Sequence, residues 1–194
     1  MTSDAWNAKY DEQRAMWGTT ANRFLLELAA DLPAGTALDL GSGQGRNSFW
    51  LAEQGHSVTG LDLSPVAVEQ AATVAAAHGL DASFEAVDLA TWDPAGRTWD
   101  LVLLSYLQLP EAVRRPVHRS AAQALASGGR LILIAHHRDN LDHGFGGPPS
   151  LDVLFTEEQL ADDFADLQIA RNEQMLRPTD DGDAIDVVLV AVRE

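Results

Sequence analysis

The chain has 194 residues, enough for one domain with a single hydrophobic core. Thirteen basic residues against 29 acidic ones give a net charge of −16, which disfavours nucleic acid and anionic membranes as partners. The absence of cysteine excludes disulfides, thiolate metal ligands and cysteine nucleophiles, and the polar N-terminus predicts a cytoplasmic protein.

The elements expected along the chain alternate between helices and short apolar strands. Helical patterns cover Trp6–Met16 and Asn22–Ala30, before the first strand. The apolar runs that predict strands are Ala37–Leu40, Val58–Leu61, Ser83–Val87, Leu101–Leu104, Leu131–Ala135, Leu167–Met175 and Ile185–Val192. This alternation predicts an α/β fold with a parallel sheet and helices on both faces.

Capping residues and glycines mark the ends of the remaining helices. Ser64-Pro65 predicts a helix start and Gly79 its end, while Thr156 to Gln159 form a capping box. Another helix is expected from Glu111 to Ala126, closed by Gly128-Gly129. The last two strands are joined by RPTDDGDA, too short for a crossover helix, so they should form an antiparallel hairpin. The stretch His136–Leu154 reads as a long irregular loop.

The segment TALDLGSGQGRNSFW places three glycines between the first strand and a helix. Ligands of open α/β sheets bind at such turns, where glycine allows sharp bends and close approach to the main chain. A dinucleotide fingerprint would need a glycine at position 46, but Arg46 stands there. Asp39, just ahead of the turn, suits a ligand with a positive group. A tight turn without any ligand is the alternative.

The pattern Asp39-x-Gly41-x-Gly43-x-Gly45 resembles the first motif of class I S-adenosylmethionine-dependent methyltransferases. The resemblance covers nearly the whole chain. It implies a Rossmann-like sheet of seven strands in the order 3-2-1-4-5-7-6, with the last strand antiparallel. The segments WNAKYDEQRAMWGTTANRF and GRNSFWLAEQG look like the small-molecule branch, which contains tellurite-resistance-type and thiopurine-type enzymes.

The resemblance also implies which residues meet S-adenosylmethionine. It implies a single domain in which residues 1–33 form a helical lid and residues 34–194 the core. Asp62 ends the second strand, where a carboxylate can accept the ribose hydroxyls. Asp88-Leu89 would frame the adenine, and Arg46 or Asn47 would meet the methionine carboxylate. The expected cofactor contacts are Trp17, Asp39, Gly41, Ser42, Gly43, Gly45, Arg46, Asn47, Asp62, Leu63, Asp88, Leu89 and Ser105.

Aromatic residues of the N-terminal segment allow two interpretations. Trp6, Tyr10 and Trp17 share one helical face, and for Trp6 and Tyr10 packing in the core is the favoured reading. Trp17 lies beside Gly18, where an aromatic ring can exclude water and face a sulfonium through cation–π attraction.

Methyl transfer is an in-line displacement that depends on alignment, so no catalytic triad is required. The acceptor pocket should be built by the N-terminal lid and the loops after the fourth and fifth strands. The residues expected in those loops are Tyr106, Gln108, His136, His137, Arg138, Asp139, Asp142 and His143. His136 and Tyr106 are the catalytic candidates. Because strand residues alternate in direction, only one of His136 and His137 can face the pocket. A histidine there is a candidate base, an anion-binding group with Arg138, or simply part of a polar loop.

The remaining alternatives concern metal and function. His137, Asp139 and His143 match no strong metal-binding spacing, so no metal is expected. A nicotinamide-dependent oxidoreductase and a cofactor-binding protein without catalysis are the competing functions. The small-molecule acceptor and the oligomeric state are not readable from the sequence.

Overall fold

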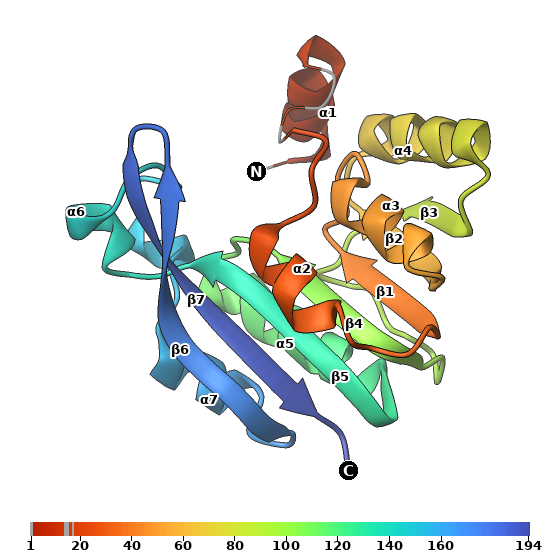
Figure 1. The fold of residues 1–194 in the computed structure, drawn as a ribbon. Helices are drawn as coiled ribbons and strands as arrows, with labels where there is room; N and C mark the ends of the chain where they lie inside the picture. The colour runs from red at the N-terminus through yellow and green to blue at the C-terminus, as the bar shows by residue number, and fades with distance from the viewer. Residues whose placement is uncertain (1, 14–15, 17) are drawn as a thin grey trace.

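The computed structural model describes residues 2–13, 16 and 18–194. Within these residues, seven strands form one mixed sheet in the order β3-β2-β1-β4-β5-β7-β6 (Figure 1). The strands are β1 Thr36–Leu40, β2 Ser57–Asp62, β3 Ala82–Ala86, β4 Trp99–Ser105, β5 Leu125–His136, β6 Gln168–Thr179 and β7 Gly182–Val192. β1 to β5 pair in parallel, while β7 runs antiparallel to both β5 and β6. The expected strand order and terminal hairpin are therefore confirmed.

The helices follow the capping signals of the sequence. They are α1 Ser3–Glu12, α2 Arg23–Ala29, α3 Arg46–Glu53, α4 Pro65–His78, α5 Glu111–Gln123, α6 Asn140–His143 and α7 Glu157–Asp163. Ser64 caps α4 at its start, and Gly79 ends it in the left-handed conformation. Thr156 and Gln159 form the predicted capping box of α7. These local signals place the helices because each satisfies backbone groups that the helix itself leaves unpaired.

Two apolar layers cover the sheet, because alternate strand residues point to opposite faces. On one face, α5 and α7 pack against a core that includes Leu38, Leu104, Leu133, Val117 and Leu160. On the other face, α2 and α3 pack against Ala37, Leu103, Ile134, Phe24 and Leu51. The arrangement confirms the expectation of helices on both faces of the sheet (Figure 1).

Four predicted boundaries differ from the structure. α5 ends at Gln123, and Gly128-Gly129 lie inside the early part of β5 rather than closing the helix. α1 covers Ser3–Glu12 instead of Trp6–Met16, of which residues 14 and 15 lie outside the described part. β6 and β7 extend through most of RPTDDGDA, so the turn between them is short. The stretch expected to be irregular contains the end of β5, α6 and a 3₁₀ turn at Leu151–Val153.

A buried ionic cluster joins α5 to α7. Asp163 Oδ2 accepts hydrogen bonds from Arg114 Nε at 2.7 Å and from the His118 ring at 2.8 Å. The side chains of Arg114 and Asp163 are 4% and 1% exposed. The His118 ring stacks on Phe164, with centroids 4.8 Å apart. Because a buried charge without its partner is costly, Asp163 should be a main determinant of this contact.

We expect Asp163→Ala to lower the free energy of unfolding by about 3–5 kcal/mol, since it leaves the buried Arg114 guanidinium uncompensated. Urea unfolding followed by tryptophan fluorescence measures this change. Asp162→Ala is the matched control: its carboxylate is 69% exposed and also contacts an arginine, Arg115. The control should cost less than about 1 kcal/mol. Equal effects of both substitutions would contradict the role of the buried cluster.

Candidate functional site

The three glycines form a left-handed turn at the carboxyl end of β1. Gly41, Gly43 and Gly45 have φ angles of +78°, +52° and +87°, which side chains of L-residues rarely allow. A Cβ atom on Gly41 would lie 3.0 Å from Leu107 Cδ1, and one on Gly43 would lie 3.0 Å from the Tyr10 hydroxyl. Both glycines are therefore required by conformation and by space, as the motif predicted.

Asp62 holds this turn against the end of β2. The Gly43 amide donates to Asp62 Oδ2 at 2.8 Å, and the Ser64 amide donates to Oδ1 at 2.8 Å. Gly41 and Ser42 donate to the Leu61 carbonyl at 2.8 and 3.0 Å. Burial raises the pKa of Asp62, and the amides of Ser64 and Gly43 oppose that shift. Asp62 thus shapes the turn itself, a role that the sequence did not reveal.

Asp39 is a buried acid with half of its carboxylate unpaired. Its Oδ2 accepts a hydrogen bond from Ser48 Oγ at 2.7 Å, whereas Oδ1 has no hydrogen-bond partner among the described residues. Burial raises the pKa of Asp39 to about 6, despite the Ser48 hydrogen bond that lowers it. The hydroxyls of Ser42 and Ser105 are likewise buried and lack partners in the described part of the chain. Unpaired buried polar atoms are costly and are found where a ligand completes them.

Arg46 and Asn47 open α3 directly after the glycine turn. The Asn22 amide donates to Asn47 Oδ1 at 2.9 Å, which ties the start of α2 to the start of α3. Burial lowers the pKa of Arg46, while neighbouring Tyr106 and Asp39 raise it. Arg46 therefore lies between the acid on β1 and the residue that follows β4. The structure brings these predicted site residues together at the carboxyl ends of the parallel strands.

Helix α1 is hydrogen-bonded to residues that follow the carboxyl end of β2. Ser3 Oγ donates to the Leu63 carbonyl at 3.1 Å, and Ser64 Oγ donates to Asn7 Oδ1 at 2.6 Å. Gln70 Nε2 donates to the Tyr10 carbonyl at 3.2 Å. Tyr10 is buried, but against the glycine turn rather than only among core side chains. The favoured core interpretation of Tyr10 missed this contact; Trp17 lies outside the described residues.

Asp88 and Leu89 follow the carboxyl end of β3. Asp88 is exposed, and its Oδ1 accepts a hydrogen bond from the Ala90 amide at 2.9 Å. Leu89 is buried in the core on the α5 side of the sheet. The acid therefore caps a turn, and it leaves its other oxygen available to solvent or ligand.

A second buried acid, Asp186, organises the ends of β4 and β5. The Tyr106 hydroxyl and Arg177 Nε both donate to Asp186 Oδ2, each at 2.7 Å. Tyr106 follows β4 with a left-handed φ of +55°, and its ring centroid lies 4.8 Å from that of His136. Burial raises the pKa of Tyr106 well above its ordinary value, so the phenol stays protonated as a donor. Sequence reasoning missed Asp186 and Arg177, although a lone acid within IDVVLVAV is a usable signal.

The neighbouring histidines go to different faces, as strand alternation predicted. His136 lies beside Tyr106 and Asp186, and its amide donates to Gln108 Oε1 at 3.0 Å. The His137 ring contacts Glu157 Oε2 at 2.9 Å and Gln174 Nε2 at 2.9 Å. His137 is thus a structural group. Across the described residues, no group of three metal-binding side chains comes together.

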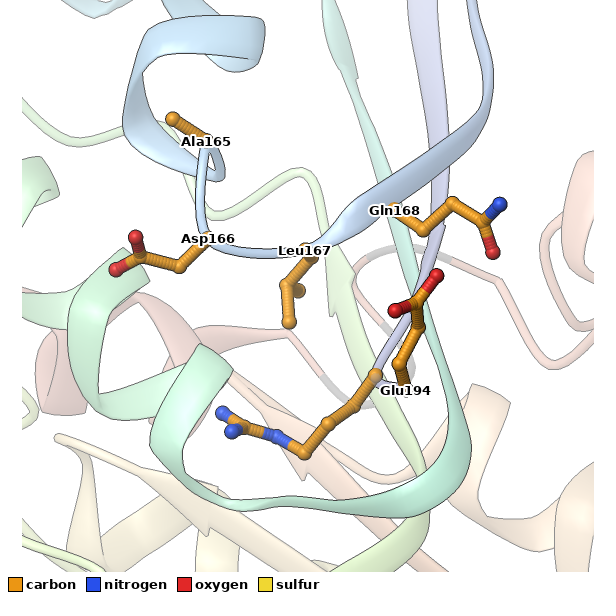
Figure 2. A pocket seen from close by; sticks show the side chains of 6 residues that line it. Ala165, Asp166, Leu167, Gln168 and Glu194 are labelled. Carbon is orange, nitrogen blue, oxygen red and sulfur yellow. The ribbon is translucent and has the colours of Figure 1, made fainter.

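A hollow of about 340 Å³ lies away from these residues (Figure 2). Its lining comes from Ala165, Asp166, Leu167, Gln168, Arg193 and Glu194. β7 ends there, opposite Arg130 near the start of the parallel part of β5. The hollow therefore lies at the amino-terminal ends of the parallel strands, whereas the glycine turn lies at their carboxyl ends. It is distinct from the candidate site.

Comparison with known proteins agrees with this geometry. A family model described as a methyltransferase domain matches residues 37–129. A 2-heptyl-1-hydroxyquinolin-4(1H)-one methyltransferase of Mycobacteroides abscessus is 26% identical over 71% of this chain and 64% of its own length. The trans-aconitate 2-methyltransferase of Rhizobium meliloti is 34% identical over 72% of this chain and 51% of its own length.

The chain thus spans only about half to two thirds of the curated relatives it matches. A solved structure from work on converting a disulfide bond into a thioacetal group during echinomycin biosynthesis matches more completely. It is 25% identical, with a TM-score of 0.78 over 100% of this chain and 93% of that one. None of the helices in the described part is long and apolar enough to cross a membrane.

The strand order agrees with the fold of that solved structure, and the glycine turn lies within the residues that the family model matches. Over residues 37–129 the chain is therefore similar to the methyltransferase domain family, and two of its curated relatives are methyltransferases.

Proposed function

We propose that this protein transfers a methyl group from S-adenosylmethionine to a small-molecule acceptor by in-line displacement. The observation that carries the proposal is the unpaired Oδ1 of Asp39, buried directly ahead of a turn that side chains cannot fill. A buried carboxylate with an elevated pKa gains most from a cationic ligand. The cofactor carries an ammonium and a sulfonium and no phosphate, so the site fits it.

We infer a role in the cofactor site for the predicted contacts that the structure describes. The main chain of Gly41, Ser42, Gly43 and Gly45 would receive the methionine part, with Asp39 on its ammonium. Arg46 and Asn47, at the start of α3, would face its carboxylate. Asp62 and Leu63 would hold the ribose, since each Asp62 oxygen keeps a lone pair beyond its amide bond. Asp88 and Leu89 would frame the adenine, and Ser105 would line the floor.

The bound cofactor supplies an electrophilic methyl group on sulfur. The chain's own contribution is alignment and the exclusion of water, which can be worth several kcal/mol. We infer that residues 1–33 form a lid and residues 34–194 the core of one domain. Two hydrogen bonds support this division: Ser3 Oγ of α1 donates to the Leu63 carbonyl, and Gln70 Nε2 donates to the Tyr10 carbonyl of α1. The Tyr10 hydroxyl also lies close to Gly43.

The acceptor is a small molecule in this proposal. The two curated relatives are named for small-molecule acceptors, one a hydroxyquinolone and the other a carboxylic acid. A net charge of −16 supports the exclusion of nucleic acid and of anionic membranes as partners. The lack of cysteine agrees with a cytoplasmic location.

Calorimetric titration separates the proposed cofactor from a nicotinamide dinucleotide. We expect S-adenosylhomocysteine and S-adenosylmethionine to bind with one site per chain, and NAD⁺ and NADH to give no saturable heat. Saturable binding of NAD⁺ or NADH without binding of either sulfur compound would point instead to an oxidoreductase.

Replacement of Asp39 should change stability and binding in opposite directions. Its pKa of about 6 in the folded protein exceeds its ordinary value of 3.8, so its ionisation destabilises the fold from about pH 4 upward, and the cost is complete above about pH 6. Asp39→Asn should therefore stabilise the free protein by about 3 kcal/mol at pH 8, an advantage that disappears below about pH 4. The same substitution should weaken S-adenosylmethionine binding by roughly 10- to 100-fold, because a charge-assisted hydrogen bond is lost.

The measurements are urea unfolding across pH and calorimetric titration at pH 8. Asp81→Asn is the matched control, because it removes the same charge from an exposed position directly before the start of β3. It should leave both quantities nearly unchanged. A loss of stability together with a loss of affinity in Asp39→Asn would mark Asp39 as a structural residue and count against the proposal.

Turnover distinguishes an enzyme from a binding protein. We expect release of S-adenosylhomocysteine when the protein is supplied with cofactor and a panel of thiols, hydroxylated aromatics, amines, carboxylic acids and tellurium or selenium oxyanions. Mass spectrometry should show a product 14 Da heavier than its acceptor, the mass of the added CH₂. Binding of the cofactor without turnover on any member of the panel would favour a sensor or scaffold.

A further inference from the structure

The register between β5 and β7 places an acid opposite the histidine of the acceptor side. His136 and Asp186 are directly paired across these antiparallel strands, so their side chains share one face of the sheet. Asp186 has no exposed side-chain surface, and the His136 side chain is 12% exposed. The arrangement buries the acid and leaves part of the imidazole accessible.

The two oxygens of Asp186 have different surroundings. Oδ2 accepts from Tyr106 and Arg177, whereas Oδ1 lies 3.0 Å from His136 Nδ1. This pair is close but not aligned as a hydrogen bond, and neither atom has another partner among the described residues. At this separation two bare acceptor atoms would repel each other, so the proton must reside on Nδ1.

The other ring nitrogen of His136 faces no such partner. Nε2 makes no hydrogen bond to any residue that the structure describes, and it is not among the atoms sealed from solvent. The neighbouring Cδ2 lies beside Gly147, where an added Cβ would be only 3.0 Å from it. A glycine at position 147 therefore keeps the accessible edge of the ring open.

We propose that Asp186 is a positioning residue that holds His136 as the Nδ1–H tautomer and leaves Nε2 as the general base for the acceptor. The inference rests on the proposed function and narrows it to acceptors that lose a proton from oxygen, nitrogen or sulfur. The proton of the acceptor passes to Nε2, the acceptor atom forms its bond to the methyl carbon, and the carbon–sulfur bond breaks. The sulfonium becomes a neutral thioether, and the imidazolium later returns its proton to water.

The surroundings of Asp186 keep it in the anionic form that this role requires. Burial alone would raise its pKa, but His136, Arg177 and Tyr106 outweigh burial and hold the pKa below its usual range. These groups come from β5, β6 and the end of β4, and the Arg46 guanidinium at the start of α3 lies near Tyr106 and Arg177. The phenol and the guanidinium therefore act through the carboxylate, and His136 alone contacts the acceptor.

The tautomer of His136 can be measured without cofactor or acceptor. Long-range ¹H–¹⁵N correlation spectra of protein with ¹⁵N-labelled histidine distinguish the protonated ring nitrogen from the bare one. The spectrum is recorded near pH 8, above the ordinary histidine pKa of about 6.5. His136→Gln assigns the signal by its disappearance. We expect Nδ1 protonated and Nε2 bare in the unsubstituted protein; the reverse pattern would overturn the proposal.

Two substitutions separate Asp186 from its neighbours. Asp186→Asn should abolish the preference for the Nδ1–H tautomer, whereas Tyr106→Phe should retain it because Oδ1 remains in place. Asp181→Asn, which removes a charge from the exposed turn of the same hairpin, is the matched control and should retain it too. An unchanged tautomer in a folded Asp186→Asn protein would refute the role of Asp186.

If Asp186→Asn does not fold, as judged by circular dichroism, the tautomer of the unsubstituted protein still decides the question. The result is also independent of the proposed function. If S-adenosylhomocysteine binds but His136 carries its proton on Nε2, the proposed base is refuted and the proposed cofactor site stands. If His136 carries its proton on Nδ1 but no cofactor binds, the proposed function is refuted and the positioning of His136 by Asp186 stands.

Discussion

The hydrogen bond from the Gly43 amide to Asp62 is the constraint on which the cofactor side of the molecule depends. A turn of left-handed glycines has no side chains of its own to hold it, so its shape must come from bonds to neighbouring elements. Asp62 supplies them by joining the turn to the end of β2 and, through Ser64, to the start of α4. Asp39 and Arg46, on either side of the turn, take their positions from this frame.

The fold buries Asp39 although burial makes its ionised form less stable. A carboxylate buried beside another acid, with one oxygen unpaired, is less stable ionised than it would be in water. A fold selected only for stability would place an apolar or amide side chain there. The acidic surface does not explain the residue, because Asp39 is only 1% exposed. The cationic ligand that we propose would offset the cost, and a locally destabilised group of this kind is typical of binding sites.

The arrangement of the glycine turn and its neighbours could be predicted from the sequence because its signals are local. Asp39, the glycines and Arg46 lie within eight consecutive residues, and capping motifs mark α4 and α7. The cluster around Tyr106 and His136 was predicted only in part. Tyr106 and His136 were found by their place after strands, but Asp186 and Arg177 reach them through pairing that no local pattern encodes. The wrong end of α5 has the opposite cause: Gly128-Gly129 is a strong local signal that the pairing of β5 overrides.

The terminal hairpin therefore does more than complete the sheet. β7 pairs Asp186 with His136, and a shift of one residue would turn Asp186 toward the α5 side. The irregularity between Ile169 and Arg171 advances β6 by one residue, which brings Arg177 rather than Leu176 onto the face of Asp186. Leu176 accordingly points outward and is 60% exposed. Because this register sets the charges around Tyr106 and His136 without touching the glycine turn, a change in the hairpin can alter those charges while the turn stays the same.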